Sequence, residues 1–320
     1  MTLISSNVNE AAQFLNEGKL VGIPTETVYG LAANIYNEAA VKGIFELKQR
    51  PLFNPLIVHI HSLSQLDELA EELPENAKLL AAALWPGELT LVVKKKAVVP
   101  DLITAGKDTV AVRMPKHPLV IQLLQYLDFP LAAPSANPFG SISPTTAQRV
   151  KDYFEGKLPM VLDGGPCSSG IESTIVGFEG EEAILYRLGA ISVEEIEGVV
   201  GAIKQQTKNE KSPEAPGMLF KHYSPKTPLL LSSDIKATVN KFLSKKVGVL
   251  VFNKEVLHPS IKHQEVLSEK QDFKEAAANL YEALHRLDHA NLDLILAERL
   301  PNRDLGKSIN DRLERAAAAN

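Results

Sequence analysis

Short apolar runs alternate with amphipathic stretches along most of this 320-residue chain, and that alternation restricts its fold more than any other feature. The apolar runs are rich in β-branched residues, which is typical of buried strands. The clearest runs are 55–60, 89–95, 109–113, 173–178 and 247–252. Because helical stretches separate these runs without a strict strand-helix-strand repeat, we predict an α/β fold whose main sheet is twisted and mixed.

One predicted helix, 37–50, carries two cations near its end. Its apolar residues recur at helical spacing, Asn37 is suited to cap its N-terminus, and Pro51 stops it. Lys48 and Arg50 are therefore expected on the last turn. There they either interact with the helix dipole or face a ligand at the edge of the sheet.

The chain loses its periodicity between residues 192 and 212, where it becomes polar and rich in lysine. Such a segment cannot bury an apolar face, so we interpret it as part of a linker between two domains. The predicted parts are a first domain at 1–195, a linker at 196–226 and a smaller parallel α/β domain at 227–320. The linker carries Phe220 and Tyr223, and it is either a lid over a cavity or a passive tether.

Composition excludes several classes of protein. The formal net charge of −5 argues against a protein that coats nucleic acid, although a local basic pocket remains allowed. The single cysteine, Cys167, excludes an internal disulfide framework and is expected to be a buried, inert thiol. Apolar runs such as 247–252 are too short to span a membrane, and the N-terminal segment has no leader pattern, so we expect a cytoplasmic protein.

Several cationic and polar side chains lie beside glycine, proline or loop residues, where they could bind an anion. The cations next to glycine, proline or small polar residues are Lys48, Arg50, Arg113 and Arg187. The proline-rich loop 133–145 adds Ser135, Asn137 and Ser143, which are short hydrogen-bonding side chains. Each feature alone also fits a solvated strand face or an ordinary turn, but together they suggest a site for a carboxylate or phosphate. The sequence contains neither a P-loop nor a GxGxxG fingerprint, so a nucleotide would be held differently.

His59 lies inside the apolar run 55–60. It is either a hydrogen-bonded core residue or a ligand contact. His61 shares its face of the strand, but no third residue of suitable spacing accompanies the pair, so we predict no metal held by the protein.

With these residues in view, the chain resembles the threonylcarbamoyl-AMP synthases of the YrdC-like family, in the longer form that has a second domain. The motifs that carry the resemblance are PTETVYGL, KQRP with NPLIVHI, WPGELT, DTVAVRMP, APSAN, DGG followed by ESTIV, and YRLG. They cover roughly residues 10 to 195, and the segment APGMLFKHYSP with the α/β remainder resembles the second domain of the family.

The resemblance implies a catalytic YrdC-like domain with a positively lined cavity, followed by a Rossmann-like domain. It implies an L-threonylcarbamoyladenylate synthase, a nucleotidyltransferase that makes threonylcarbamoyl-AMP and pyrophosphate from L-threonine, bicarbonate or CO2, and ATP. Mg2+ would arrive with ATP. The product would pass to a downstream threonylcarbamoyl transferase complex, which modifies tRNAs that read codons beginning with A.

The resemblance also implies roles for individual residues. The catalytic KxR signature falls on Lys48 and Arg50, and the SxN signature falls on Ser135 and Asn137. The residues implied in threonine binding are Thr27, His59, Arg113, Ala133 and Ser173. Those implied in nucleotide binding are Arg50, Asn54, Thr109, Ser135, Asn137, Ser143, Arg187 and Tyr223.

The implied reaction explains why cations from separate elements would converge. A carboxylate, a carbamate and a triphosphate must share one cavity, and like charges 4 Å apart repel by about 1 kcal/mol in water and about 4 kcal/mol near a protein surface. Two rival functions are an RNA-binding module without catalysis and a carbamoyl transferase of hydrogenase maturation. The negative charge and the aromatic content of 6% count against the first, and the single cysteine, with no zinc module, counts against the second.

Overall fold

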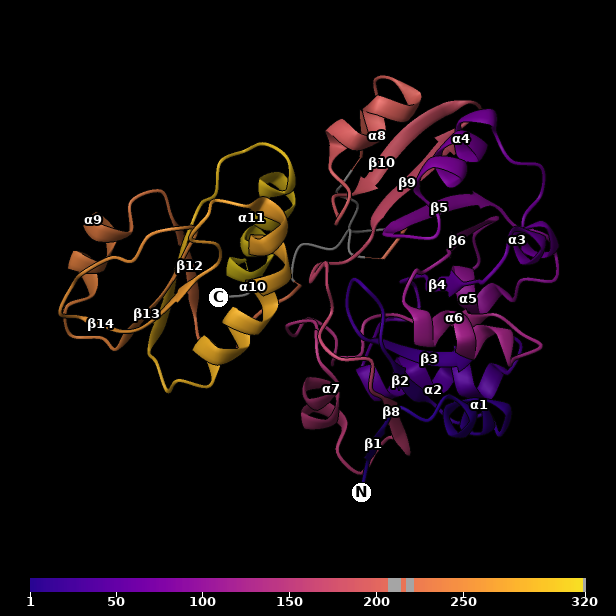
Figure 1. The fold of residues 1–320 in the computed structure, drawn as a ribbon, viewed down its shortest axis with the longest axis horizontal. Coiled ribbons are helices and arrows are strands. Elements are labelled where there is room, and N and C mark those ends of the chain that lie inside the picture. Colours follow the sequence, from indigo (N-terminus) through magenta and orange to yellow (C-terminus); the bar gives the residue numbers. More distant parts are fainter. Residues whose placement is uncertain (207–213, 217–221, 319–320) are drawn as a thin grey trace.

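The computed structural model describes residues 1–206, 214–216 and 222–318, which form two lobes of unequal size (Figure 1). The larger lobe contains a sheet of 11 strands within the described residues, in the order β1-β8-β2-β3-β7-β4-β6-β5-β9-β10-β11. Both parallel pairs, such as β4 with β6, and antiparallel pairs, such as β5 with β6, occur in it. The predicted mixed α/β fold is therefore confirmed.

The strands of the larger sheet are β1 (Leu3–Ser5), β2 (Val21–Ile23), β3 (Gly30–Asn34), β4 (Ile57–His59), β5 (Leu89–Lys94), β6 (Thr109–Arg113), β7 (Leu131–Ala132), β8 (Met160–Leu162), β9 (Thr174–Glu179), β10 (Glu182–Arg187) and β11 (Lys204–Gln205). The helices of this lobe are α1 (Val8–Asn16), α2 (Glu38–Lys48), α3 (Leu63–Leu69), α4 (Glu75–Leu84), α5 (Asp101–Thr104), α6 (Pro118–Gln125), α7 (Ala147–Phe154) and α8 (Val193–Val200).

Helix α2 begins as predicted but ends earlier. The Asn37 side chain accepts a hydrogen bond from the Ala40 backbone N–H and caps the first turn. Gln49 adopts a left-handed conformation with φ of 54°, so the helix ends at Lys48. The expectation that Arg50 lies on the last turn is wrong, because the chain has already left the helix before Pro51. This exit allows Arg50 to turn toward the sheet instead of following the helix axis.

The smaller lobe contains a parallel sheet in the order β12-β15-β13-β14. Its elements are β12 (Leu229–Ser232), α9 (Ile235–Val239), a 3-10 turn (Asn240–Phe242), β13 (Val247–Val251), β14 (Ile261–Val266), α10 (Phe273–Asp288), β15 (Leu294–Glu298) and α11 (Leu305–Ala317). Helices α10 and α11 lie on the side of this sheet that faces the larger lobe (Figure 1). The smaller parallel α/β fold predicted from the sequence is confirmed.

Two elements occupy the start of the predicted linker. Helix α8 crosses residue 196, and β11 pairs in parallel with β10 of the larger sheet. Much of the predicted lid, including Phe220, lies outside the described residues, whereas 214–216 and Tyr223 are described. Both Ala215 and Tyr223 are buried.

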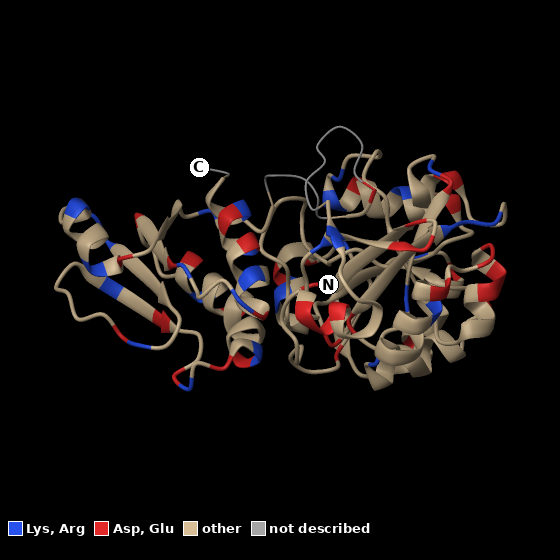
Figure 2. Cartoon of the chain, turned by 90° about the horizontal axis from the view of Figure 1, so that it is seen from above, with Lys and Arg blue, Asp and Glu red and all other residues tan. Residues whose placement is uncertain are grey.

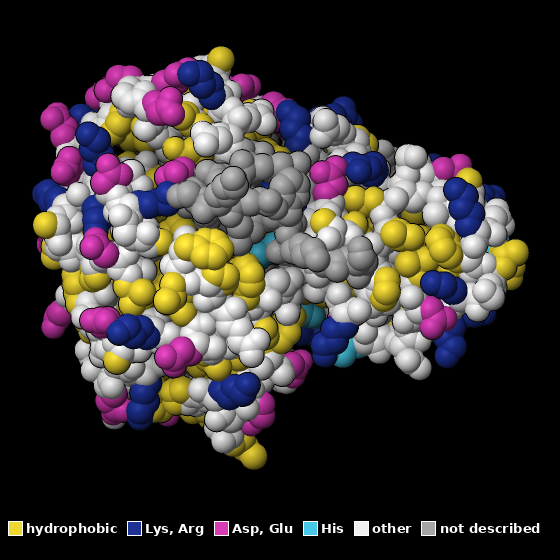
Figure 3. Space-filling model, turned by 180° about the vertical axis from the view of Figure 1, so that it is seen from behind, with side chains coloured by type: hydrophobic (Ala, Val, Ile, Leu, Met, Phe, Trp, Pro, Cys, Tyr) yellow, Lys and Arg dark blue, Asp and Glu magenta, His cyan; other side chains and the backbone are white. Residues whose placement is uncertain are grey.

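Polar contacts connect the two lobes. Arg149 of α7 forms a two-pronged ion pair with Glu282 of α10, with nitrogen–oxygen distances of 2.7 and 3.2 Å. Figure 3 shows imidazole side chains where the lobes meet, and His285 and His289 line a small depression there beside Arg149. Basic and acidic residues are interspersed along both lobes, as the colours of Figure 2 show.

Two further expectations can be compared with the structure. Cys167 is free and buried, as predicted. Within 1–206, 214–216 and 222–318, no helix is both long enough and apolar enough to cross a bilayer.

Candidate functional site

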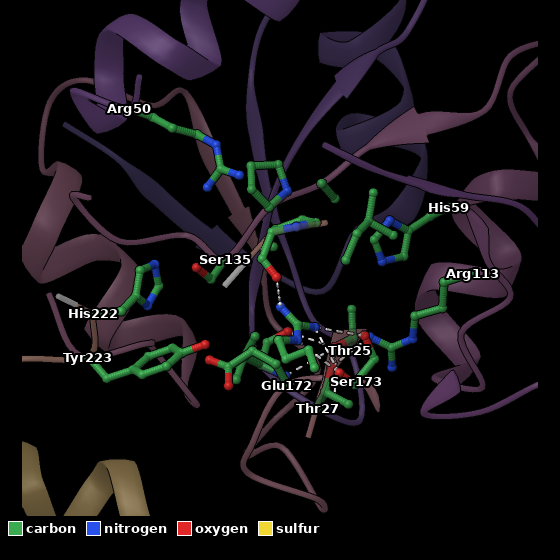
Figure 4. Close-up of a pocket in the computed structure, with 17 residues that line it drawn as sticks. Thr25, Thr27, Arg50, His59, Arg113, Ser135, Glu172, Ser173, His222 and Tyr223 are labelled. Carbon is green, nitrogen blue, oxygen red and sulfur yellow. Dashed lines mark hydrogen bonds between the residues drawn. The ribbon is translucent and has the colours of Figure 1, made fainter. Parts of the chain in front are cut away.

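A pocket in the larger lobe is lined by residues from many separate elements (Figure 4). The loop between β2 and β3, the ends of β4, β6 and β10, and the residues after β7 all contribute to its wall. The predicted site residues that line it are Thr27, Arg50, His59, Arg113, Ala133, Ser135, Ser173, Arg187 and Tyr223. The structure thus brings together residues as far apart in the sequence as Thr27 and Tyr223.

Arg113 is fixed at one side of the pocket by a buried ion pair. One of its terminal nitrogens lies 2.6 Å from the Glu26 carboxylate, and the other donates to the Thr27 hydroxyl at 2.7 Å. Its Nε donates to the Gly87 carbonyl. Arg113 and Glu26 have side chains only 4% and 3% exposed, so the guanidinium is held with little freedom. Arg113 and Thr27 both line the pocket, and both belong to the predicted threonine site.

Arg187 and Ser173 form a second polar group of the pocket. Arg187 donates twice to the Ser173 carbonyl and once to the Ser173 hydroxyl, while Thr90 shares a 2.7 Å hydrogen bond with that hydroxyl. Gly189 permits this packing, because a Cβ there would lie 2.2 Å from the backbone nitrogen of Thr174. The glycine of the YRLG motif is therefore required for the close approach of two backbone segments.

Arg50 lies across the pocket from Arg113 and His59 (Figure 4). Its guanidinium donates to the backbone carbonyls of Asn54 and Pro55. Burial, together with Arg187, lowers the pKa of Arg50 to about 9. Burial also lowers the pKa of Arg187. Both shifts reflect cations that are removed from water, and a bound anion would relieve the cost.

Lys48 does not line the pocket. Its ammonium donates to the carbonyls of Ser135 and Asn137, so it lies beneath the loop that follows β7. The Lys48 carbonyl accepts a hydrogen bond from the Phe139 backbone N–H. Burial, with Arg50 nearby, holds the pKa of Lys48 well below its usual value. The KxR and SxN signatures therefore meet, and Lys48 fixes the loop that presents Ser135.

Four other predicted residues lie outside the pocket lining. Asn137 donates to the carbonyls of Pro138 and Ser141, which closes the turn after Ser135. Ser143 donates to the Glu172 carboxylate at 2.7 Å and so lies behind the wall. The remaining two are Asn54 and Thr109.

Asn54 and Thr109 differ in what surrounds them. Both polar atoms of the buried Asn54 side chain lack a hydrogen-bond partner among the described residues. Unpaired buried amides are rare, so Asn54 remains suited to a ligand. Thr109 borders a separate surface depression with Asp108 and Phe178. It begins β6 whereas Arg113 ends it, which separates them by about 13 Å.

Sequence reasoning missed two carboxylates at or next to the pocket. Glu172 lines the pocket, and Glu26 pairs with Arg113 behind it. An anion-binding site gave no reason to expect acidic residues. Their only sequence signal was position, since Glu26 lies within PTETVYGL and Glu172 lies within ESTIV. Thr25 and His222 also line the pocket without having been predicted.

The pocket histidines are held neutral. Burial, with Arg113 nearby, lowers the pKa of His59 to about 3. Burial, with Arg50 and Lys48 nearby, holds the pKa of His222 well below its usual range. His59 and His222 each have an Nδ1 atom that is buried without a hydrogen-bond partner among the described residues. Neutral imidazoles add polar contacts to the pocket without adding to its positive charge.

Metal ligands were not predicted from the sequence. Among the residues that the structure describes, no three His, Cys, Asp or Glu side chains are grouped so as to hold a metal ion.

Comparison with known proteins identifies the family. A family described under the heading telomere recombination, which groups Sua5, YciO and YrdC, matches residues 13–189. The family described as the C-terminal domain of threonylcarbamoyl-AMP synthase matches residues 191–318. The chain belongs to the threonylcarbamoyl-AMP synthase family.

Members of this family are similar to the chain along nearly its whole length. The threonylcarbamoyl-AMP synthase of Pyrococcus abyssi is 43% identical, over 96% of this chain and 93% of that protein. The Bacillus subtilis threonylcarbamoyl-AMP synthase is 40% identical, over 97% of this chain and 92% of that protein. The crystal structure of P. abyssi Sua5 complexed with L-threonine superimposes with a TM-score of 0.92 at 39% identity, covering 99% of this chain and 98% of that one.

Proposed function

We propose that this protein is an L-threonylcarbamoyladenylate synthase, which forms threonylcarbamoyl-AMP and pyrophosphate from L-threonine, bicarbonate or CO2, and ATP. The observation that carries the proposal is the convergence of Arg50, Arg113 and Arg187 on one buried pocket. Family membership gives the reaction, and the pocket supplies charges of the sign that its reactants need.

The threonine subsite is supported by the side of the pocket near Arg113. A guanidinium suits a carboxylate, and the hydroxyls of Thr27 and Ser173 with the neutral His59 can bond a small polar amino acid. The apolar side chains that also line the wall, such as Ile57, exclude water from a product that water would hydrolyse.

The nucleotide subsite is supported by the opposite side, which holds Arg50 and Ser135. There the carbamate oxygen of carboxylated threonine would attack the α-phosphorus of ATP, while the bond to pyrophosphate breaks. Positioning and charge stabilisation account for most of such a reaction. Mg2+ enters as part of the MgATP substrate, where it neutralises phosphate oxygens. Lys48 contributes by holding the Ser135 loop instead of touching the reactants.

The described part of the linker lines the same pocket. Arg187 donates to the Pro216 carbonyl, and His222 and Tyr223 close one side. A linker whose described residues form part of the pocket wall favours the lid over the passive tether.

The product is an activated mixed anhydride, so a downstream threonylcarbamoyl transferase complex acting on tRNA is its expected consumer. We expect no strong direct binding of this chain to nucleic acid, because its formal net charge is −5 and basic and acidic residues are interspersed along both lobes (Figure 2).

The experiment is pyrophosphate release from MgATP, measured with and without L-threonine and bicarbonate. The proposal expects release that depends on both. The rival RNA-binding module expects tight, salt-sensitive retention of tRNA in a filter assay without threonine-dependent release, and that outcome would refute the synthase.

A further inference from the structure

Glu172 is a carboxylate in the wall of a pocket that otherwise collects cations. Its two oxygens are occupied by donors from three residues. Ser143 donates to Oε1 at 2.7 Å, Tyr281 contacts Oε1 and Oε2 at 3.0 and 2.9 Å, and Arg312 Nε lies 3.2 Å from Oε2. Glu172 is 6% exposed and Arg312 is fully buried. Both oxygens of the carboxylate are thus already engaged by donors.

Two of those donors come from the smaller lobe. Tyr281 lies on α10 and Arg312 on α11, whereas Glu172 precedes β9 of the larger lobe. Both donors also contact Tyr223, the linker residue in the pocket wall. The Arg312 guanidinium stands 5.4 Å from the centre of the Tyr223 ring, and the Tyr281 ring lies 5.7 Å from it. One buried cluster therefore joins the second lobe, the linker and the pocket.

The charges of this cluster depend on one another. Without Arg312, a buried carboxylate would face the space where a triphosphate must bind, and like charges repel strongly where water is scarce. Burial lowers the pKa of Arg312, but Tyr223 and Glu172 outweigh that effect and raise it, so the guanidinium stays charged. Arg312 also lies 3.1 Å from the Asp311 carboxylate, but Asp311 has a second partner in Arg315, so the Arg312 charge can offset that of Glu172.

We propose that Arg312 is a positioning residue of the second lobe, which neutralises Glu172 and thereby sets the affinity of the pocket for its anionic nucleotide. The inference rests on the proposed function only in naming ATP as that nucleotide. It gives the smaller lobe a defined part in the reaction: it supplies the counter-charge that makes the pocket wall compatible with phosphate.

The test compares three variants by titration calorimetry with ATP and by the KM for ATP and kcat in pyrophosphate release. Arg312→Met is expected to weaken ATP binding and raise the KM by about tenfold or more while kcat changes less, since a repulsion of about 1.4 kcal/mol corresponds to a factor of ten. Arg312→Met combined with Glu172→Gln removes both charges, and is expected to restore the affinity to within about threefold of the wild type. The control is Arg149→Met, which breaks a different and partly exposed ion pair between the lobes, to Glu282, and is expected to leave ATP affinity unchanged.

Equal effects of Arg312→Met and Arg149→Met on ATP affinity would overturn the inference, because a merely structural contact between lobes would explain both. A double variant no better than Arg312→Met would overturn it too. If Arg312→Met does not fold, Glu172→Gln alone decides: it should tighten ATP binding, and unchanged or weaker binding would contradict the charge argument. Failure of the proposed function is distinct, since it would appear as a wild-type protein without threonine-dependent pyrophosphate release, whatever the variants do to ATP binding.

Discussion

Protonation of His59 gives a prediction whose size follows from its burial. His59 is 2% exposed, and its pKa falls from 6.5 to about 3 because of burial and the nearby Arg113. The unfolded chain binds the proton below pH 6.5, whereas the folded protein does not until pH is near 3. Keeping His59 neutral therefore costs the folded protein nothing above pH 6.5, and the free energy of unfolding decreases progressively as pH falls from 6.5 toward 3.

The free energy can be worked out for a convenient interval. Between pH 7 and pH 5 the His59 imidazole becomes protonated in the unfolded state but not in the folded state. This difference lowers the free energy of unfolding by about 2 kcal/mol. Other buried histidines, such as His285 with a pKa lowered by burial to about 4, add their own losses. The wild type alone therefore cannot isolate the effect of His59.

The assay is urea unfolding of the wild type and of His59→Gln at pH 7 and pH 5. Glutamine cannot take up a proton in this range, so the variant should lose about 2 kcal/mol less than the wild type between the two pH values. The absolute stability of the variant does not matter, because the comparison is between slopes. Identical pH dependence in the two proteins would refute the claim that His59 is held neutral by its surroundings.

The other predictions concern groups that hold the pocket in place. Glu26→Gln leaves the buried Arg113 without a counter-charge and should lower the free energy of unfolding by about 3–5 kcal/mol. The control is Glu38→Gln, which breaks the exposed pair with Lys42 and should change that free energy little. Similar losses for the two variants in urea unfolding would contradict the prediction. Lys48→Met keeps the unbranched stem of the side chain but removes the ammonium that donates to the Ser135 loop, so kcat/KM for pyrophosphate release should fall by about 10²-fold. Near wild-type turnover would rule out the positioning role.

Elements with strong local signals could be predicted from the sequence. Helix α2 starts at the cap that Asn37 offers, and strands such as β5 and β13 are continuous apolar runs. Strand β14 was missed because it reads IKHQEV, and all of its residues are partly or fully exposed at the edge of the smaller sheet. An edge strand needs little apolar character, so its sequence carries little signal.

The site was less accessible to sequence reasoning, since it depends on tertiary contacts. Lys48 and Arg50 are two residues apart, yet one lies beneath a loop and the other lines the pocket, because the left-handed Gln49 separates them. Glu172 was missed because a lone carboxylate conflicts with an anion site. The charge of Glu172 is balanced by Arg312, which lies 140 residues further along the chain, so the pairing becomes visible in the folded structure and not in the sequence.

The central claim is that cations from separate elements hold the anionic reactants together, and a crystal structure with L-threonine and a non-hydrolysable ATP analogue tests it most directly. The account predicts the threonine carboxylate in hydrogen-bond contact with Arg113 and phosphate oxygens in contact with Arg50 and Arg187. Ligands bound elsewhere, or bound in this pocket with the three guanidinium groups still satisfied only by backbone and side-chain partners, would contradict it.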